Sequence, residues 1–396
     1  MNVYLDNSAT TKPRPEVTER IRTVMDESYG NPSALHDGGM AAEKILRESR
    51  SQLAAALQTR AEDGEIVFTS GGTESDNMAL LCGARARKRQ GRRIISSGIE
   101  HPAVLESCKA LAAEGFEVVF AAVDGNGAVC PASVEAAMNE ETVLISCMHV
   151  NNETGAIQPV AEICRIKEDF ERRMGKRVLL HVDAVQSFGK LPPLHGGERR
   201  EQIDLLSLSA HKIHGPKGTG ALFIKKGCHM QPLFYGGGQE RGLRPGTENV
   251  PGIAGFGLAA ALAAGGIRER MERVGACKKH LLDGLRAEVK DIRVNGAEQA
   301  PDSSPYILNV SFLGVRGEVL LHGLELRGIW VSTGSACTSR KKGSSHVLSA
   351  MGRSEAEAEG AIRFSFSEYN TAEEMEYTAA AVKDAVLKFR RLGRFR

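Results

Sequence analysis

The chain has 396 residues, of which 42% are hydrophobic and 43 are glycine, so it is long enough for a large core and for two domains. Its 51 basic and 49 acidic residues nearly cancel, which gives no global argument for binding nucleic acid or an anionic membrane. The N-terminus lacks a basic stretch followed by an apolar one, and no apolar run approaches the roughly 20 residues of a membrane span. We therefore expect no signal peptide and no membrane segment.

Eight cysteines are scattered along the chain without any C-x-x-C pair. This argues against a zinc or iron–sulfur site of local spacing, and we expect no metal. Sparse cysteines in a large chain are typical of a reducing compartment, so the expected location is cytoplasmic.

The first two thirds of the chain alternate short apolar strands with amphipathic helices. Helical spacing is expected at 74–89, 101–115, 131–140 and 160–175. Strands with few polar residues, joined by helices, indicate an α/β fold with a mainly parallel sheet that helices cover on both faces. The seven expected strands lie at 65–70, 93–97, 116–123, 142–150, 178–185, 203–210 and 221–226.

The pattern changes after about residue 260. A long helical stretch is expected over 258–290, and the last helix begins with Thr371-Ala372-Glu373-Glu374, a capping box. Between them lie short strands, near 292–296, 306–314, 329–336 and 361–367. These elements predict a smaller α+β domain. The expected division is a large domain over 16–260 and a small one built from 1–15 and 261–396.

Two charged residues stand at the ends of apolar strands. Lys212 follows "SLSAH", where desolvation lowers the pKa of an amine and makes it nucleophilic. Such an amine can form a Schiff base with an aldehyde cofactor such as pyridoxal phosphate. Asp183 ends "VLLHVD", where an ionised carboxylate needs a cation such as that cofactor's ring nitrogen, and Gln186 can hydrogen-bond the phenolic oxygen. The alternatives are a lysine in a surface loop and an aspartate that caps a helix.

An anion site is expected where "FTSGGTESDN" passes from a strand through two glycines into a helix. Such a turn presents backbone N–H groups to a phosphate, although the lysine of a Walker motif is absent. Gly72 and Thr73 lie in the turn, and Ser209 and His211 can complete the cradle. The alternative is a plain turn in which Thr73 caps the helix.

Four further residues are candidates for chemistry. His101, at a helix start, can stack on an aromatic cofactor and shuttle protons, and Asn152 in "HVNNETG" is a similar candidate; both can also be structural. Cys337 precedes the basic residues 340–342, which favour a thiolate, although it can also be a free surface cysteine. Arg363 projects from an apolar strand and needs a carboxylate, either structural or on a substrate.

Together these motifs resemble the cysteine desulfurases of the NifS/IscS type, in the class V aminotransferase group. The resemblance spans nearly the whole chain through "VYLDNSATT", "GNPSALHDGG", "TSGGTESDN", "EHPAV", "HVNNETGAIQP", "HVDAVQSFGK", "SAHKIHGPKG", "RPGTENV", "GSACTS" and "IRFSFS". It implies a pyridoxal-phosphate-dependent transferase of fold type I. It also implies that L-cysteine is converted to L-alanine, with sulfane sulfur held as a persulfide and passed to a sulfur-acceptor or iron–sulfur scaffold protein.

The resemblance implies a role for each candidate residue. The implied catalytic residues are Lys212, Cys337 and His101, and the implied substrate-binding residues are Asn152 and Arg363. Thr247, in "RPGTENV", matches a threonine that reaches the phosphate of the other subunit, which implies a homodimer. The implied cofactor-binding residues are Gly72, Thr73, His101, Asn152, Asp183, Gln186, Ser209, His211, Lys212 and Thr247.

Alternative functions remain at this point. Within the same chemistry, a selenocysteine lyase or another class V aminotransferase fits the same residues. A non-catalytic scaffold for sulfur assembly would keep the fold without the reaction. Nucleic-acid binding would depend on the basic C-terminal run alone. The receiving pathway is also open between nitrogenase clusters, general iron–sulfur assembly and tRNA thiolation.

Overall fold

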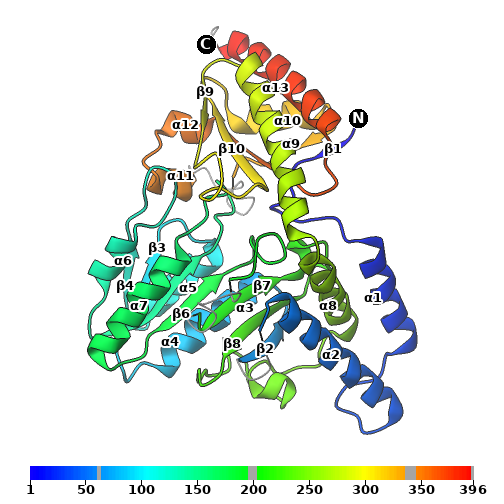
Figure 1. Cartoon of the computed structure of the whole chain (residues 1–396), viewed down its shortest axis with the longest axis vertical. Coiled ribbons are helices and arrows are strands. Elements are labelled where there is room, and N and C mark those ends of the chain that lie inside the picture. Colours follow the sequence, from blue (N-terminus) through cyan, green and yellow to red (C-terminus); the bar gives the residue numbers. More distant parts are fainter. Residues whose placement is uncertain (60–63, 195–202, 335–344, 394–396) are drawn as a thin grey trace.

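The computed structural model describes residues 1–59, 64–194, 203–334 and 345–393. Its main feature is a seven-stranded sheet (Figure 1). Its strand order is β2-β8-β7-β6-β5-β3-β4, and β8 runs antiparallel to both neighbours while all other pairs are parallel. The mainly parallel seven-stranded sheet is therefore confirmed. The strands are β2 (Gly64–Thr69), β3 (Arg93–Ser97), β4 (Glu117–Ala121), β5 (Thr142–Met148), β6 (Leu179–Asp183), β7 (Leu205–Ser209) and β8 (Gly220–Lys225).

Helices cover both faces of this sheet. Successive side chains of a strand point to opposite faces, so each strand contributes apolar side chains to both layers of helices. On β6, Leu180 and Val182 join one apolar cluster, whereas Leu179 joins another on the opposite face. The first face is covered by α1 (Pro15–Glu27), α2 (Asp37–Ala56), α6 (Pro131–Ala137), α7 (Val160–Met174) and α8 (Val250–Ala264). The second is covered by α3 (Gly72–Asn77), η1 (Met78–Cys82), α4 (Gly83–Ala86) and α5 (Pro102–Ala113).

Two expected helices differ from the structure. The stretch expected over 74–89 contains a π-helical segment, η1, between α3 and α4. The single helix expected over 258–290 is wrong, because α8 ends at Ala264 and α9 (Ile267–Glu288) begins at an angle of 81° to it. Gly266 at the break has φ 60° and ψ 31°, a left-handed conformation that glycine adopts without the steric cost of a Cβ.

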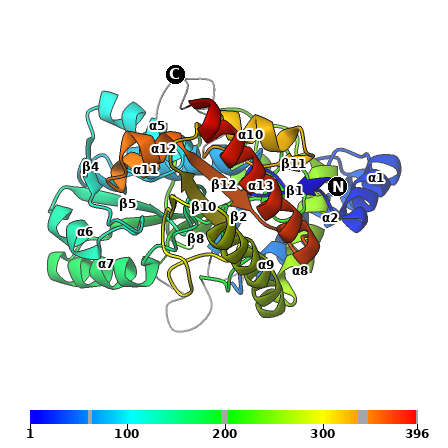
Figure 2. The same cartoon turned by 90° about the horizontal axis from the view of Figure 1, so that it is seen from above.

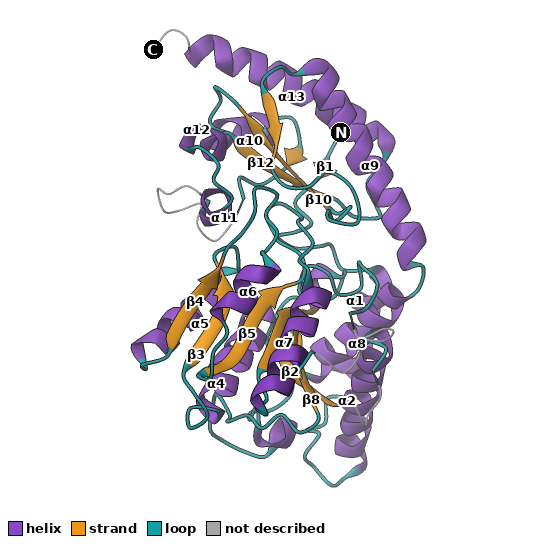
Figure 3. Cartoon of the chain, turned by 60° about the vertical axis from the view of Figure 1, so that its left-hand side comes forward, coloured by secondary structure: helices purple, strands orange, loops and turns teal. Residues whose placement is uncertain are grey.

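A second group of elements lies beyond the sheet's upper edge (Figure 3). Its antiparallel sheet has the order β12-β10-β9, and β1 (Val3–Tyr4) pairs in parallel with β11 (Ile329–Trp330). α9 and α13 lie side by side along this group (Figures 1 and 2). The remaining elements are η2 (Ala210–Lys212), η3 (Gln239–Gly242), β9 (Ile292–Val294), β10 (Ile307–Phe312), α10 (Gly317–Glu325), α11 (His346–Ala350), α12 (Glu355–Glu359), β12 (Ala361–Ser365) and α13 (Ala372–Gly393).

The predicted capping box of α13 is confirmed. The Thr371 N–H donates to Glu374 Oε2 at 3.1 Å, and the Glu374 N–H donates to Thr371 Oγ1 at 3.2 Å. Among the described helices, none is by itself both long enough and apolar enough to span a membrane.

Candidate active site

Most of the predicted site residues meet where the central parallel strands end. The register pairs Met148 of β5 with Asp183 of β6, and Asp183 with Ser207 of β7, so the three strands finish at nearly the same level. The carboxyl edge of a parallel sheet is the usual place for a ligand in α/β proteins. Asn152 and the turn that carries Lys212 both follow these strand ends.

Lys212 lies in η2, directly after β7, and is half-buried. Its Nζ donates to the carbonyl oxygens of Ser8 and Ala9, the latter at 2.8 Å. The N–H and hydroxyl of Thr11 each donate to the His211 carbonyl at 2.9 Å, so the N-terminal segment 6–11 is bound to this turn. The loop-lysine alternative is wrong, because the amine points into the molecule against backbone carbonyls.

Asp183 is 6% exposed at the end of β6. Its Oδ1 accepts a hydrogen bond of 2.9 Å from the Val185 N–H. Burial, and secondarily the nearby Asp76, raise the pKa of Asp183 to about 7, while Lys212 acts in the opposite direction. A carboxylate in this position is stabilised by a cation. Gln186 lies beside it, with Nε2 donating to the Ser8 carbonyl at 3.0 Å.

The glycine turn fits an anion. A Cβ on Gly72 would lie 2.7 Å from Val185 Cγ2, so only glycine allows the helix start to approach the Asp183 turn this closely. The first N–H groups of a helix have no partner within it. Ser209 is 1% exposed, and its hydroxyl has no hydrogen-bond partner among the described residues. An orphaned hydroxyl beside free helix N–H groups is a suitable phosphate site.

Two expected details of this turn are resolved. Gly71 is the N-cap of α3 and Thr73 is its second residue, so the alternative in which Thr73 caps the helix is wrong. Thr73 is exposed at the turn. His211 Nδ1 lies 3.2 Å from Thr10 Oγ1, and burial together with Lys212 lowers the pKa of His211 to about 4. The imidazole is therefore neutral at pH 7 and binds anions by hydrogen bonding alone.

His101 is the N-cap of α5, as its position at a helix start predicted. Its Nδ1 accepts a hydrogen bond of 3.1 Å from the Ala103 N–H, which assigns the proton of the neutral ring to Nε2. Burial, and then the positive charge of Lys212, lower the pKa of His101 to about 4. The ring is therefore a neutral donor close to the lysine.

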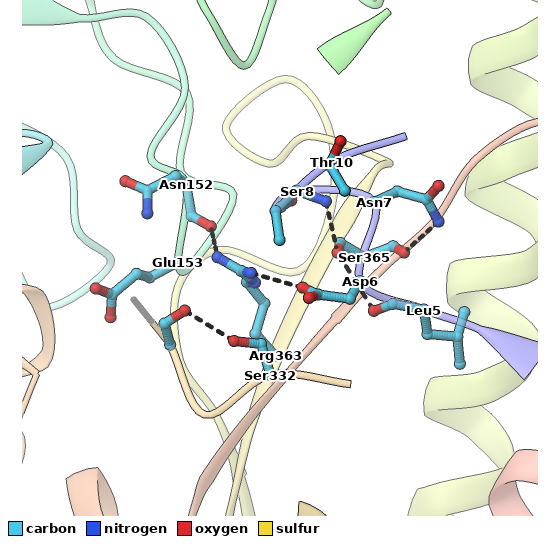
Figure 4. A network of polar contacts seen from close by, with 12 residues as sticks. Leu5, Asp6, Asn7, Ser8, Thr10, Asn152, Glu153, Ser332, Arg363 and Ser365 are labelled. Atoms are coloured by element: carbon cyan, nitrogen blue, oxygen red, sulfur yellow. Dashed lines mark hydrogen bonds and ion pairs between the residues drawn. The ribbon is translucent and has the colours of Figure 1, made fainter. Parts of the chain in front are cut away.

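Arg363 is buried on β12, on the second sheet, and connects the two groups of elements (Figure 4). One terminal nitrogen is 2.8 Å from Asp6 Oδ1, and the other donates to the Asn152 carbonyl at 2.9 Å. Its Nε has no hydrogen-bond partner in the described part of the chain. Asp6 is thus a structural carboxylate partner of Arg363, and the side chain of Asn152 is half-buried.

Cys337 lies outside the described residues, whereas both flanks of its segment are described. The Ser345 hydroxyl donates to Glu153 Oε2 at 2.5 Å, and a Cβ on Gly334 would lie 3.0 Å from the same oxygen. The described residues on either side of this segment, Gly334 and Ser345, therefore both lie beside Glu153, the neighbour of Asn152.

Thr247 does not join the site within one chain. Its side chain is exposed, and no hydrogen bond connects it to the other candidates among the described residues. Three residues earlier, Arg244 Nε lies 3.0 Å from Glu74 Oε1, which holds this segment next to α3.

Several functional neighbours escaped the sequence analysis. Asp6 and Ser8 belong to "VYLDNSATT", a motif that carried the resemblance without an assigned role. Asp76 and Glu100 are 1% and 0% exposed, and they lie within "TSGGTESDN" and "EHPAV". For Glu100, three residues after β3, an acid near a strand end was a usable signal, because it had also identified Asp183. Within the described ranges, no group of three or more His, Cys, Asp or Glu side chains is placed to hold a metal ion.

A half-buried amine and a buried carboxylate at the carboxyl edge of a mainly parallel sheet define the class of pyridoxal-phosphate enzymes of fold type I. The family model described as aminotransferase class V matches residues 3–378, and the chain belongs to this family. The family depends on pyridoxal phosphate.

The similar proteins cover the chain almost completely. A cysteine desulfurase IscS from Dictyoglomus turgidum is 40% identical over 100% of this chain and 97% of its own length. One from Methanosarcina thermophila is 42% identical over 99% of this chain and 93% of its own length. A solved structure of a NifS-like protein superposes with a TM-score of 0.89 at 39% identity, covering 98% of this chain and 100% of that one.

Proposed function

We propose that this enzyme is a cysteine desulfurase. It converts L-cysteine to L-alanine and passes the sulfur, held as a persulfide on Cys337, to an acceptor for iron–sulfur cluster assembly or other sulfur transfer. The observation that carries the proposal is the meeting of Lys212 and Asp183 at one sheet edge, in a chain whose relatives are cysteine desulfurases.

The residues at the strand ends would hold the cofactor. Bound pyridoxal phosphate supplies an aldehyde that joins an amine covalently and a ring that accepts an electron pair. Lys212 would be the point of covalent attachment, and Asp183 would pair with the ring nitrogen. Gln186 and Asn152 would hydrogen-bond the phenolic oxygen, and His101 would stack on the ring. The residues assigned to the phosphate are Gly72, Thr73, Ser209 and His211.

Two residues act on the substrate before its sulfur is removed. Arg363 binds the carboxylate of L-cysteine, for which its planar guanidinium is suited. The Lys212 amine would take the proton from Cα as a general base. The Nε of Arg363, which has no hydrogen-bond partner among the described residues, supports the role of Arg363 in binding the carboxylate. This donor remains available while a terminal nitrogen pairs with Asp6.

Cys337 completes the reaction. Its thiolate attacks the sulfur of L-cysteine, so that an S–S bond forms while the C–S bond breaks. The carbon that loses sulfur gains a proton, and the products are L-alanine and a Cys337 persulfide. No additional oxidant or reductant is needed. His101, with its proton on Nε2, is placed to move protons during these steps.

Replacing Cys337 with serine tests the proposal. Cys337→Ser should abolish release of both alanine and sulfide from L-cysteine, measured together in the presence of a thiol reductant, while the bound cofactor remains. Cys130→Ser is the matched control, because Cys130 is a half-buried free cysteine with no assigned role in the reaction, and it should retain activity. Normal turnover by Cys337→Ser would contradict the proposed role.

The proposed assembly is a homodimer in which Thr247 reaches the phosphate of the partner's site. The exposure of Thr247 in the single chain supports this proposal. So do large apolar side chains that are exposed on the single chain, a feature typical of interfaces. Examples are Met25 (61%), Tyr29 (85%), Leu35 (96%), Met40 (54%) and Tyr235 (88%).

Two further expectations become proposals. The division into 16–260 and the combination of 1–15 with 261–396 is supported by one apolar cluster, in which Val3 and Leu5 pack with residues between 274 and 386. A cytoplasmic location is supported by the seven described cysteines, all of which are free thiols.

A further inference from the structure

A row of polar side chains lies behind Asp183 on the same face of the sheet. His181 precedes Asp183 by two residues on β6, so strand alternation points both side chains to this face. His181 is 0% exposed. Its Nδ1 lies 2.9 Å from the Ser146 hydroxyl on β5, and its Nε2 lies 2.9 Å from the Ser207 hydroxyl on β7. Ser207 is itself the register partner of Asp183.

Asp76 closes this row from the helix side. It comes from α3, which covers the face, and it is 1% exposed. Its Oδ1 lies 3.5 Å from His181 Nε2 and has no hydrogen-bond partner in the described part of the chain. The Ser207 hydroxyl also hydrogen-bonds the Asp76 side chain. Ser207 therefore contacts both His181 and Asp76, and it lies on β7 directly opposite Asp183 of β6.

The protonation of these groups can be derived from their surroundings. Burial raises the pKa of Asp76 to about 7, so a substantial fraction of this carboxyl is ionised near neutral pH. Burial lowers the pKa of His181 to about 4, so the imidazole stays neutral and does not cancel the charge of Asp76. Asp76 in turn raises the pKa of Asp183. The other charged or titratable groups that act on Asp183 and its neighbours are Glu100, before α5, and Lys212, in η2.

We propose that Asp76 is a positioning residue that acts through Asp183, and that with Ser207 and His181 it sets the negative potential behind the ring nitrogen of bound pyridoxal phosphate. The inference rests on the proposed role of Asp183 in the site. A negative charge on Asp76 would favour a cation at the ring nitrogen and a proton on the nitrogen of Lys212, because it adds to the charge of Asp183. Replacing Asp76 with a neutral isostere removes that contribution.

The test compares Asp76→Asn with Asp204→Asn in the cofactor-loaded full chain. Asp204 is a good control, because it is also 0% exposed and immediately precedes β7, but it pairs with Lys167 Nζ at 2.9 Å and Arg177 at 3.1 Å. The readouts are the pH at which the absorption band of the bound cofactor changes and the dissociation constant of the cofactor. Neither readout depends on turnover.

For Asp76→Asn we expect the spectroscopic midpoint to move down by about one pH unit and the cofactor to bind about tenfold more weakly, since one pKa unit corresponds to a factor of ten. Asp204→Asn should lower thermal stability while leaving both readouts at wild-type values. Ser207→Ala, which removes the hydrogen bond that favours the charged form of Asp76, should move the midpoint in the same direction by less. It also provides the test if Asp76→Asn does not fold.

Failure of this inference and failure of the proposed function give different results. If Asp76→Asn, or Ser207→Ala in its place, titrates like the wild type, the row behind Asp183 has only a structural role and the inference is wrong. If the wild-type chain itself takes up no pyridoxal phosphate, the proposed function fails first, whatever the variants do.

Discussion

In the proposed mechanism, binding of the substrate carboxylate depends on one side chain, Arg363. Its guanidinium is buried between a carboxylate, Asp6, and a backbone carbonyl, Asn152, so it is held in one orientation before any substrate arrives. A planar fork in a fixed orientation binds a carboxylate through paired hydrogen bonds, which a lysine cannot reproduce.

Arg363→Lys should therefore raise KM for L-cysteine by about tenfold, because about one charge-assisted hydrogen bond is lost, while the absorption of the bound cofactor stays the same. Steady-state kinetics of alanine release measures this. Asp6→Asn is the control, because it removes the competing carboxylate and leaves the guanidinium, so its KM should be equal to or below that of the wild type. An unchanged KM in Arg363→Lys would exclude Arg363 from substrate binding.

We expect the buried carboxyl of Glu100 to make the free energy of unfolding depend on pH. Its Oε1 accepts from the Ser97 hydroxyl at 2.6 Å and the Met148 N–H at 3.1 Å, yet burial raises its pKa from 4.5 to about 8. The folded chain therefore binds a proton that the unfolded chain releases between these values. The contribution of Glu100 to stability is greatest below the unfolded pKa and falls as pH rises toward about 8.

Glu100→Gln should flatten this dependence, because an amide does not titrate. Urea unfolding of the full chain at several pH values from about 5 to about 8 measures the slope, which should decrease in magnitude by up to about one proton. Glu106→Gln, an exposed acid on α5, should leave the slope as it is. A wild-type slope in Glu100→Gln would show that Glu100 does not hold the proton.

At the scale of residues, the sequence identified groups whose own surroundings are unusual. Lys212 and Asp183 stand out because a charge follows an apolar strand. Ser8 and Asp6 do not, because they contribute through contacts with Lys212 and Arg363 more than 200 residues away. No local pattern encodes such pairs, so the N-terminal side of the site could only be found in the fold.

Among the elements, the strands were predictable and one helix break was not. Each central strand is an apolar run of strand length, and the register then aligns the ends. The α8–α9 break was missed because alanine and leucine continue the helical pattern up to Gly265–Gly266. The chain turns there because Gly265 is extended and Gly266 is left-handed. Apolar spacing predicts which residues are buried better than it predicts where a helix changes direction.

This break gives a prediction on stability. Gly266→Ala should lower the free energy of unfolding by roughly 1–2 kcal/mol, because an L-residue is strained in the left-handed conformation. Gly265→Ala, at φ −79°, should be neutral or stabilising by about 0.5 kcal/mol, since alanine adopts this conformation without strain. Urea unfolding measures both. Equal effects of the two substitutions would mean that the left-handed turn does not define the break.

For the whole molecule, the proposed dimer can be tested by complementation. A chain with Lys212→Ala still carries Thr247, and a chain with Thr247→Ala still carries Lys212. If Thr247 acts on the partner's site, a mixed dimer contains one intact site and one doubly defective site. Mixed dimers should then show about half of the wild-type activity per dimer, as expected for independent sites.

The same mixed dimers distinguish this arrangement from the alternative within one chain. If Thr247 served the site of its own chain, each site in the mixed dimer would lack one group, and activity would stay at the level of the two parent variants. Sedimentation equilibrium should give about twice the 42.6 kDa chain mass for the wild type. A monomer in solution would contradict the shared site.

The proposed mechanism requires that the amine at position 212 is joined covalently to pyridoxal phosphate. Borohydride reduction of the purified protein, proteolysis and mass spectrometry test this bond directly. We expect one reduced adduct, on the peptide that contains Lys212, and Lys217→Ala is a control that should keep it, because the Lys217 side chain is exposed. An adduct on the neighbouring buried Lys190, or no adduct on any lysine, would contradict the attachment at Lys212.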